Sequence, residues 1–362
     1  MVKHSPENIL VVVQRSNGDV FLSEPLLRGL ARAYGNPRID LLVNDDTLAI
    51  AKTLPHVSGI HTYSYRERAE GKKGQSMALY RKLFLKYDLA ISLTASDRSV
   101  LFARVAARKA ISAVEPDPGK SRWKRLLLSG HYRFDTGRHI LENNTAALGL
   151  LGIDGGPLEV RAHHTAAAGK SVERMLAERG IGEFILFHPG AQYEYKVYPQ
   201  EHRNKLLAML DGLGVAIVVT GSKSAVDIGI KRSLPKLRNL HDFIGCTSMD
   251  ELIALSARSM AYIGADTLNM HIAAAQDRQV FAIFGPTLPA TWSPWCNGLH
   301  RATRESMPVQ RYGNITMFQA DMECVPCGKA GCDDHHGRSD CLYHIEPETI
   351  FHEVEAWLKR SR

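Results

Sequence analysis

Short apolar runs and amphipathic stretches alternate along most of the chain. The first apolar run covers residues 9–13 and predicts a buried strand. A polar turn with Gly18 follows it, and then a helix is predicted in which Leu26, Leu27 and Leu30 share one face. A strand followed closely by a helix is the first unit expected of a parallel sheet.

The same alternation continues through the first half of the chain. Residues 39–45 and 88–95 are apolar runs that predict further strands, and residues 142–151 predict a helix. Residues 66–76 are polar and charged, and they predict an exposed loop. Strands that alternate with helices favour a doubly wound α/β domain.

The second half repeats this pattern after a segment rich in turn residues, 152–170, in which we place the interdomain linker. Strands with their following loops are predicted at 184–191, 215–222, 261–267 and 279–287, and helices at 202–214 and 249–259. We therefore predict one domain over residues 1–160 and a second over 161–345. An amphipathic helix follows within residues 346–362, with Ile350, Phe351, Val354 and Trp357 on its apolar stripe.

Length and hydropathy narrow the class of protein. A chain of 362 residues with 44% hydrophobic and 23% charged residues can form two globular domains. It contains no apolar run of about 18 residues that would predict a membrane span. The apolar run at residues 9–13 is also too short for a secretory signal, so we expect the protein to work in the cytoplasm.

Positive charge is concentrated in one part of the chain. The formal net charge is +7, yet residues 66–138 alone hold 17 Lys and Arg against 7 Asp and Glu. A basic face attracts phosphate-rich glycolipids, anionic bilayers and RNA alike, and it can also be a solvated face without a partner. Charge by itself leaves these alternatives open.

The first candidate for chemistry is Asp19, directly after the first predicted strand. Gly18 beside it lets the backbone approach a ligand closely, and a carboxylate in this position can take a proton from an acceptor hydroxyl. The alternative is that Asp19 only caps the helix that follows.

The second candidate is the loop that begins with His188. Its glycine and backbone N–H groups, together with Lys196, suit the oxygens of a phosphate group. An ordinary strand-to-helix loop with a surface lysine would have the same composition.

The third candidate is the most specific segment of the chain. Asp266 and Thr267 end a predicted strand, and a helix of small residues opens with His271. A helix N-terminus favours a diphosphate, Thr267 can donate to the same oxygens, and His271 can neutralise a leaving group. Alternatively, His271 is a hydrogen-bonded residue of the core.

These motifs, in this order, resemble a known family. GDV after the first strand, HPGA with a following lysine, and DT-x-x-x-HIAAA with FGPT downstream are similar to the ADP-heptose lipopolysaccharide heptosyltransferases, the inverting glycosyltransferases of family nine. The resemblance spans most of the chain. It implies an α/β fold of GT-B type, in which two Rossmann-like, doubly wound domains face each other across a cleft and the last helix packs back toward the first domain.

The resemblance also implies a role for each candidate residue. Asp19 would be the general base, and Lys196 and Thr267 would hold the diphosphate. The remaining donor-site residues would be His188, Gly221, Ser222, Asp266 and His271. Two departures stand out: Leu268 occupies a position where the family often has glycine, and Lys223 and Ser224 stand where it often has an acidic residue.

The implied reaction moves heptose from ADP-heptose to a Kdo or heptose residue of the lipopolysaccharide inner core, with inversion. Because the donor half holds no Asp-x-Asp motif, we expect no required metal or cofactor. The expected partners are the nucleotide sugar, the anionic acceptor and, peripherally, the cytoplasmic face of the inner membrane, without nucleic acid. A different nucleotide sugar as donor, or a noncatalytic nucleotide- or polyanion-binding protein, are the alternatives.

Four of the six cysteines lie close together near the C-terminus. Cys324, Cys327, Cys332 and Cys341 form C-x-x-C-x(4)-C-x(8)-C. A structural zinc site would suit four sulfur ligands, although the second pair is spaced unlike a usual zinc ribbon. Zinc, a disulfide in an isolated preparation, and plain thiols are therefore all open.

Overall fold

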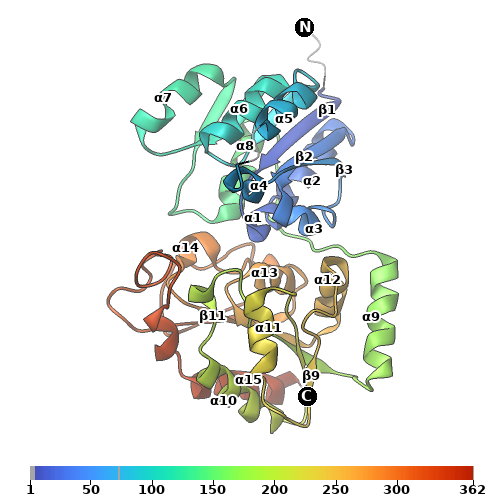
Figure 1. The fold of residues 1–362 in the computed structure, drawn as a ribbon, viewed down its shortest axis with the longest axis vertical. Helices are drawn as coiled ribbons and strands as arrows, with labels where there is room; N and C mark the ends of the chain where they lie inside the picture. The colour runs from blue at the N-terminus through green and yellow to red at the C-terminus, as the bar shows by residue number, and fades with distance from the viewer. Residues whose placement is uncertain (1–4, 72–73, 362) are drawn as a thin grey trace. The chain divides into compact units, whose positions relative to one another are not determined.

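The computed structural model describes residues 5–71 and 74–361. The chain divides into two compact units, Met1–Val160 and Arg161–Arg362, each built around a mainly parallel sheet (Figure 1). No helix in the described ranges is long and apolar enough to cross a membrane.

Unit 1 contains six parallel strands in the order β3-β2-β1-β4-β5-β6. The strands are β1 Asn8–Val13, β2 Arg38–Asn44, β3 Val57–Tyr63, β4 Tyr87–Ser92, β5 Ala107–Val114 and β6 Gly130–Arg133. The helices are α1 Asn17–Phe21, α2 Glu24–Tyr34, α3 Leu48–Ala51, α4 Tyr65–Ala69, α5 Gln75–Leu83, α6 Asp97–Ala106, α7 Pro118–Leu127 and α8 Ile140–Leu150.

Burial explains the apolar run of the first strand, residues 9–13. Residues 9–13 are all buried, because β1 lies between β2 and β4 and both faces of the sheet are covered. The chain moves outward from β1 to β2 and β3 and then returns to β4 on the other side of β1. This reversal makes the carboxyl ends of β1 and β4 the switch point of the sheet, where ligands of such folds bind.

Two local expectations for unit 1 were wrong. The turn predicted around Gly18 is the short helix α1, because Ser16 and Asp19 form a capping box at its start. The loop predicted over residues 66–76 contains α4 and the start of α5, since Ser64 caps α4 by accepting a hydrogen bond from the Glu67 N–H. Lys72 and Lys73 of that loop lie outside the described residues.

Unit 2 contains seven strands in the order β12-β13-β11-β10-β7-β8-β9, all parallel except β12. The strands are β7 Phe184–His188, β8 Ala216–Val219, β9 Leu240–Asp242, β10 Ala261–Ala265, β11 Gln279–Phe284, β12 Val309–Tyr312 and β13 Ile315–Gln319. The helices are α9 Ala166–Glu178, α10 Gln200–Asp211, α11 Ala225–Arg232, α12 Met249–Arg258, α13 Leu268–Ala275, α14 Pro289–Trp292 and α15 Pro347–Ser361.

The last helix, α15, packs within unit 2. Its residues Ile350, Val354 and Leu358 are buried in the same core cluster as residues of α10, and Trp357 meets Phe281 of β11 edge-on. The apolar stripe predicted from the sequence is therefore covered by residues of unit 2. The packing toward the first domain that the resemblance implied stays a prediction.

Candidate active site

The switch point of unit 2 lies between β7 and β10. From β7 the chain moves to β8 and β9 on one side, and α12 then returns it to β10 on the other side of β7. Lys196, in the loop after β7, places its Nζ 2.7 Å from Oδ2 of Asp266, the residue that follows β10. This ion pair spans the place where a parallel sheet of this kind binds its ligand.

Helix α13 begins at the same edge. Thr267 is its N-cap residue, and α13 is eight residues long. His271 and Asn269 are buried in its first turns, and the His271 Nδ1 and Asn269 Oδ1 atoms have no hydrogen-bond partner in the described part of the chain. Buried polar atoms are rarely left unsatisfied, so both atoms are available to a polar ligand at this edge.

Burial sets the protonation state of both candidate donor-site histidines, His188 and His271. It lowers the pKa of His271 to about 4, an effect that Lys196 reinforces and Asp266 opposes. Burial likewise lowers the pKa of His188 to about 4 against the opposing charge of Asp227. Both imidazoles are therefore neutral at pH 7, and the Nδ1 atom of His188 lies 3.0 Å from the Thr220 hydroxyl oxygen.

The loop after β8 is organised by Asp227 of α11. The Ser222 backbone N–H and hydroxyl both donate to Oδ2 of Asp227. A Cβ atom at Gly190 would collide with Oδ1 of the same carboxylate. Gly190 therefore has to be glycine, because the loop after β7 passes directly over this buried carboxylate.

In unit 1, Asp19 lies at the switch point between β1 and β4. Its Oδ2 atom accepts hydrogen bonds from the Ser16 backbone N–H at 3.2 Å and the Ser16 hydroxyl at 2.6 Å. The Arg15 Nε atom lies 2.9 Å from Oδ1. Asp19 is thus a buried carboxylate that caps α1 and is also paired with a cation.

Unsatisfied polar atoms gather near Asp19. Gln14 Nε2, Asn17 Oδ1 and Asn44 Oδ1 are buried without a hydrogen-bond partner among residues 5–71 and 74–361. Gln14 and Asn17 follow β1, and Asn44 ends β2, so all three lie at the carboxyl ends of neighbouring strands. Such a group of orphan donors and acceptors fits a polar ligand at this edge.

Comparison with known proteins decides the family. Residues 76–315 match the family model described as "Glycosyltransferase family 9 (heptosyltransferase)". The matched residues make up more than half of the chain. The chain belongs to glycosyltransferase family 9. The resemblance found in the sequence is therefore confirmed, and the protein is a glycosyltransferase.

Individual relatives agree with this placement. Lipopolysaccharide heptosyltransferase 3 of Escherichia coli K12 is 27% identical over 292 residues, which cover 79% of this chain and 84% of the relative. Lipooligosaccharide heptosyltransferase 2 of Haemophilus influenzae is 28% identical over 307 residues, covering 79% and 86%. The solved structure of E. coli ADP-heptose LPS heptosyltransferase II is similar with a TM-score of 0.71 at 21% identity, over 98% of this chain and 99% of that chain. The predicted GT-B type of fold, with two Rossmann-like domains, is confirmed.

All four cysteines of the C-terminal segment of this family 9 glycosyltransferase are free thiols in the structure, and the zinc and disulfide alternatives stay predictions. Cys324, Cys327 and Cys332 are exposed free thiols and Cys341 is a buried one. Within the described residues, no three His, Cys, Asp or Glu side chains come together as metal ligands. Burial and the neighbouring cysteines raise the pKa of the Cys341 thiol to about 12.

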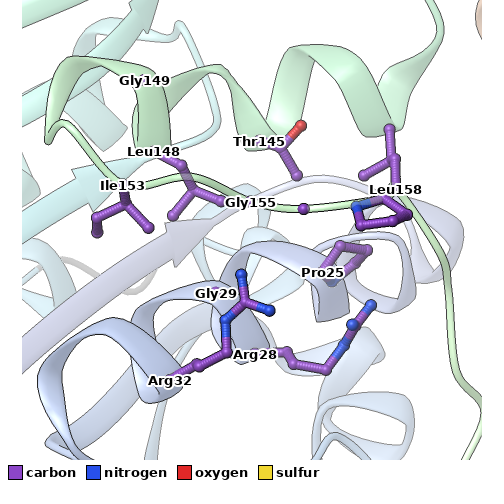
Figure 2. Close-up of a pocket in the computed structure, with 12 residues that line it drawn as sticks. Pro25, Arg28, Gly29, Arg32, Thr145, Leu148, Gly149, Ile153, Gly155 and Leu158 are labelled. Atoms are coloured by element: carbon purple, nitrogen blue, oxygen red, sulfur yellow. The ribbon is translucent and has the colours of Figure 1, made fainter.

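A separate pocket of about 190 Å³ lies in unit 1, lined by α2, α8 and residues 153–158 (Figure 2). The Arg28 Nη2 atom donates to the Glu159 carbonyl oxygen at 2.6 Å, and Arg32 Nη2 donates to the Asp154 carbonyl oxygen at 2.9 Å. None of the candidate site residues lines this pocket. Its arginines instead fasten the segment before Val160 to α2.

Sequence reasoning missed Asp227 and Asn269 in this glycosyltransferase. Asp227 follows Ser224 by three residues, a spacing typical of a helix start, so its only sequence signal indicated a cap. Asn269 had no sequence signal, because an asparagine within a predicted helix does not by itself indicate a binding site. Its significance comes from burial without a partner.

Proposed function

We propose that this glycosyltransferase transfers heptose from ADP-heptose to a Kdo or heptose residue of a lipopolysaccharide inner core, with inversion at the anomeric carbon. The observation that carries the proposal is the Lys196–Asp266 pair beside the N-terminus of α13 at the switch point of unit 2. The names of the relatives support the donor and the acceptor class.

The diphosphate of the donor binds at the start of α13. Backbone N–H groups of its first turn and the Thr267 hydroxyl donate to phosphate oxygens, and Lys196 supplies the positive charge. Lys196 is three-quarters buried and already paired with Asp266, so it is held in place before the ligand arrives. These contacts strengthen as the ADP leaving group gains charge, which lowers the barrier to transfer.

The remaining donor contacts lie at the same edge of the unit 2 sheet. Neutral His271 and Asn269 present their unsatisfied atoms to the sugar or the phosphate, and His188, Gly221 and Ser222 border the nucleoside. Asp227 acts through Ser222, because its carboxylate holds the loop that contains this residue.

Asp19 serves as the general base. The acceptor hydroxyl oxygen forms a bond to the anomeric carbon, the bond from that carbon to the phosphate oxygen breaks, and the acceptor proton passes to the Asp19 carboxylate. Ser16 and Arg15 hold this carboxylate in a fixed position. Because the attacking oxygen and the leaving phosphate lie on opposite faces of the sugar, the configuration inverts.

The acceptor is an anionic glycolipid, so we place the enzyme peripherally at the cytoplasmic face of the inner membrane. The excess of Lys and Arg within residues 66–138 supports this location.

Replacing Asp19 with alanine tests the assignment. We expect Asp19→Ala to abolish heptose transfer while ADP still binds in calorimetry, since the base acts on the acceptor. Ser16→Ala is the matched control, because it removes the capping hydroxyl bonded to Asp19 and leaves the carboxylate. It separates the effect of a weakened helix cap from the effect of a lost base. Near-normal turnover by Asp19→Ala would show that Asp19 is not the general base. Turnover with UDP- or GDP-linked sugars in place of ADP-heptose would contradict the assignment of ADP-heptose as the donor.

A further inference from the structure

Unit 2 contains a second cavity, which is separate from the candidate active site. Its volume is about 700 Å³, and its walls come from residues 194–199 of the loop after β7, from α10 and α11, and from residues 338–343. None of the candidate donor-site residues lines it. The volume falls within the range of about 300–1,000 Å³ that is typical of sites for small organic molecules. We call this cavity the α10–α11 pocket.

Arg203 of α10 brings a buried positive charge to the α10–α11 pocket. The residue lines the cavity and is only 2% exposed. Among the residues that the structure describes, its hydrogen-bond acceptors are neutral: Nε donates to Asn204 Oδ1 at 3.1 Å, and Nη2 donates to the Ser233 hydroxyl oxygen at 2.8 Å. A buried charge is unfavourable unless a group of opposite charge accompanies it. The Arg203 guanidinium therefore favours an anion inside this cavity.

No acidic side chain of the described residues supplies that negative charge. Burial alone lowers the pKa of Arg203 to about 10, so the guanidinium is still charged at pH 7. Glu194 also lines the cavity, but it is exposed and does not contribute to this shift. The charge of Arg203 is thus available to a ligand.

Two further polar side chains of the lining belong to the segment that precedes Cys341. Ser339 is 3% exposed, and its Oγ atom has no hydrogen-bond partner in the described part of the chain. Arg338 is exposed, and its Nε atom lies 2.7 Å from Oδ1 of Asp340. Because a buried hydroxyl is rarely left unsatisfied, Ser339 provides a second, independent indication that a polar ligand binds here.

The remaining lining is largely apolar. Tyr198 and Leu342 are 1% and 2% exposed, and Ile230 of α11 is also buried. Val197 and Pro199 of the loop after β7 line the same cavity. An inorganic ion would leave these side chains without a contact, whereas an anionic group attached to an apolar body would contact both kinds of lining.

We propose that the α10–α11 pocket is a second binding site of this enzyme and takes a small organic anion. Arg203 pairs with the phosphate or carboxylate group of this ligand, Ser339 donates to the same group, and the apolar walls cover the rest of the molecule. A guanidinium donates to two oxygens of either group, so both share the chemistry that the pocket offers.

Calorimetry of the full chain tests this site with three probes of similar size: phenyl phosphate, benzoate and the uncharged benzyl alcohol. We expect at least one of the two anions to bind about tenfold or more tightly than benzyl alcohol, because a charge-assisted contact is added. The tighter of the two anions identifies the group that the pocket prefers. Neither anion binding more tightly than benzyl alcohol would overturn the proposal.

Variants of the lining assign the binding to this pocket. Arg203→Met should lower the affinity for the preferred anion by about tenfold or more, and Ser339→Ala should lower it by about threefold. Unchanged affinity in Arg203→Met would overturn the proposal. If that variant does not fold, unchanged affinity in Ser339→Ala would do so, because its replacement breaks no hydrogen bond of the described structure.

Two controls separate this site from general charge and from the donor site. Arg232→Gln changes an exposed arginine of α11 that does not line the cavity, and it should bind the anion like the wild type. Lys196→Met changes the donor site and should also leave anion binding intact. An equal loss of affinity in Arg232→Gln and Arg203→Met would indicate nonspecific charge attraction, and loss of binding in Lys196→Met would place the probe in the donor site. Either result would overturn the proposal.

Discussion

Acid should destabilise unit 2 through its buried histidines. His271 is 4% exposed, and its folded-state pKa of about 4 lies below the ordinary value of 6.5. Between pH 6.5 and 4 the His271 imidazole is therefore protonated in the unfolded chain and neutral in the folded chain. Wherever the unfolded state holds more protons than the folded state, a fall in pH lowers the stability of the folded state. The contribution of neutral His271 is therefore complete above pH 6.5 and is lost as the pH falls toward 4.

The magnitude follows from the shift. One pKa unit corresponds to about 1.4 kcal/mol, so His271 costs unit 2 about 2 kcal/mol at pH 5 and about 3 kcal/mol at pH 4. His188 carries a shift of the same direction and cause, and adds a similar loss. A loss of this size is a large fraction of the stability of an ordinary domain.

The assay compares His271→Gln with wild type at pH 7.5 and pH 5. Amide hydrogen exchange of β10 and α13 in urea reports the free energy of unfolding of unit 2 separately from that of unit 1. We expect the wild type to lose about 2 kcal/mol more than the variant between the two pH values. His352→Gln, an exposed histidine of α15, is the matched control. An equal loss in wild type and His271→Gln would refute the reasoning.

Three further predictions concern the donor half and its framework. Lys196→Met should weaken ADP binding by about tenfold in calorimetry, since a charge-assisted contact to the diphosphate is lost, and an unchanged affinity would contradict the donor-site assignment. Gly264→Ala should cost about 3 kcal/mol in urea unfolding, because a Cβ atom there would collide with the His188 carbonyl oxygen, and a melt like the wild type would show that β7 and β10 can separate. Ser248→Ala should cost about 1 kcal/mol by breaking the capping box with Glu251 at the start of α12, while ADP affinity stays the same.

Much of the framework was predictable because local patterns and tertiary structure agree. The apolar run at residues 9–13 became β1, and the helix predicted at 202–214 corresponds to α10, Gln200–Asp211. The antiparallel strand β12 and the short strand β9 were missed, because each is only three or four residues long and depends on its neighbours for stability. Exposed α4 was missed for a related reason: its polar sequence resembles a loop, and capping by Ser64 is its main support.

The candidate residues could be predicted from the sequence because they follow predicted strands. The side chains that they contact could not be predicted from this position. The sequence alone indicated Asp19, Lys196 and Asp266, because the carboxyl ends of parallel strands gather polar residues at one edge. Their partners depend on residues distant along the chain. Lys196 meets Asp266 only because β10 returns to the side of β7, and no spacing in the sequence encodes that distance.

The amino-acid sequence by itself determined the alternation of strands and helices, the division into two α/β halves and the resemblance to a glycosyltransferase family. These features depend on residue periodicity and on short motifs, both of which are local. Only the tertiary structure decided that His271 is neutral and that Asp227 holds the loop of Ser222. Burial, charge pairing and the proximity of distant segments arise when the chain packs, so no local pattern can contain them.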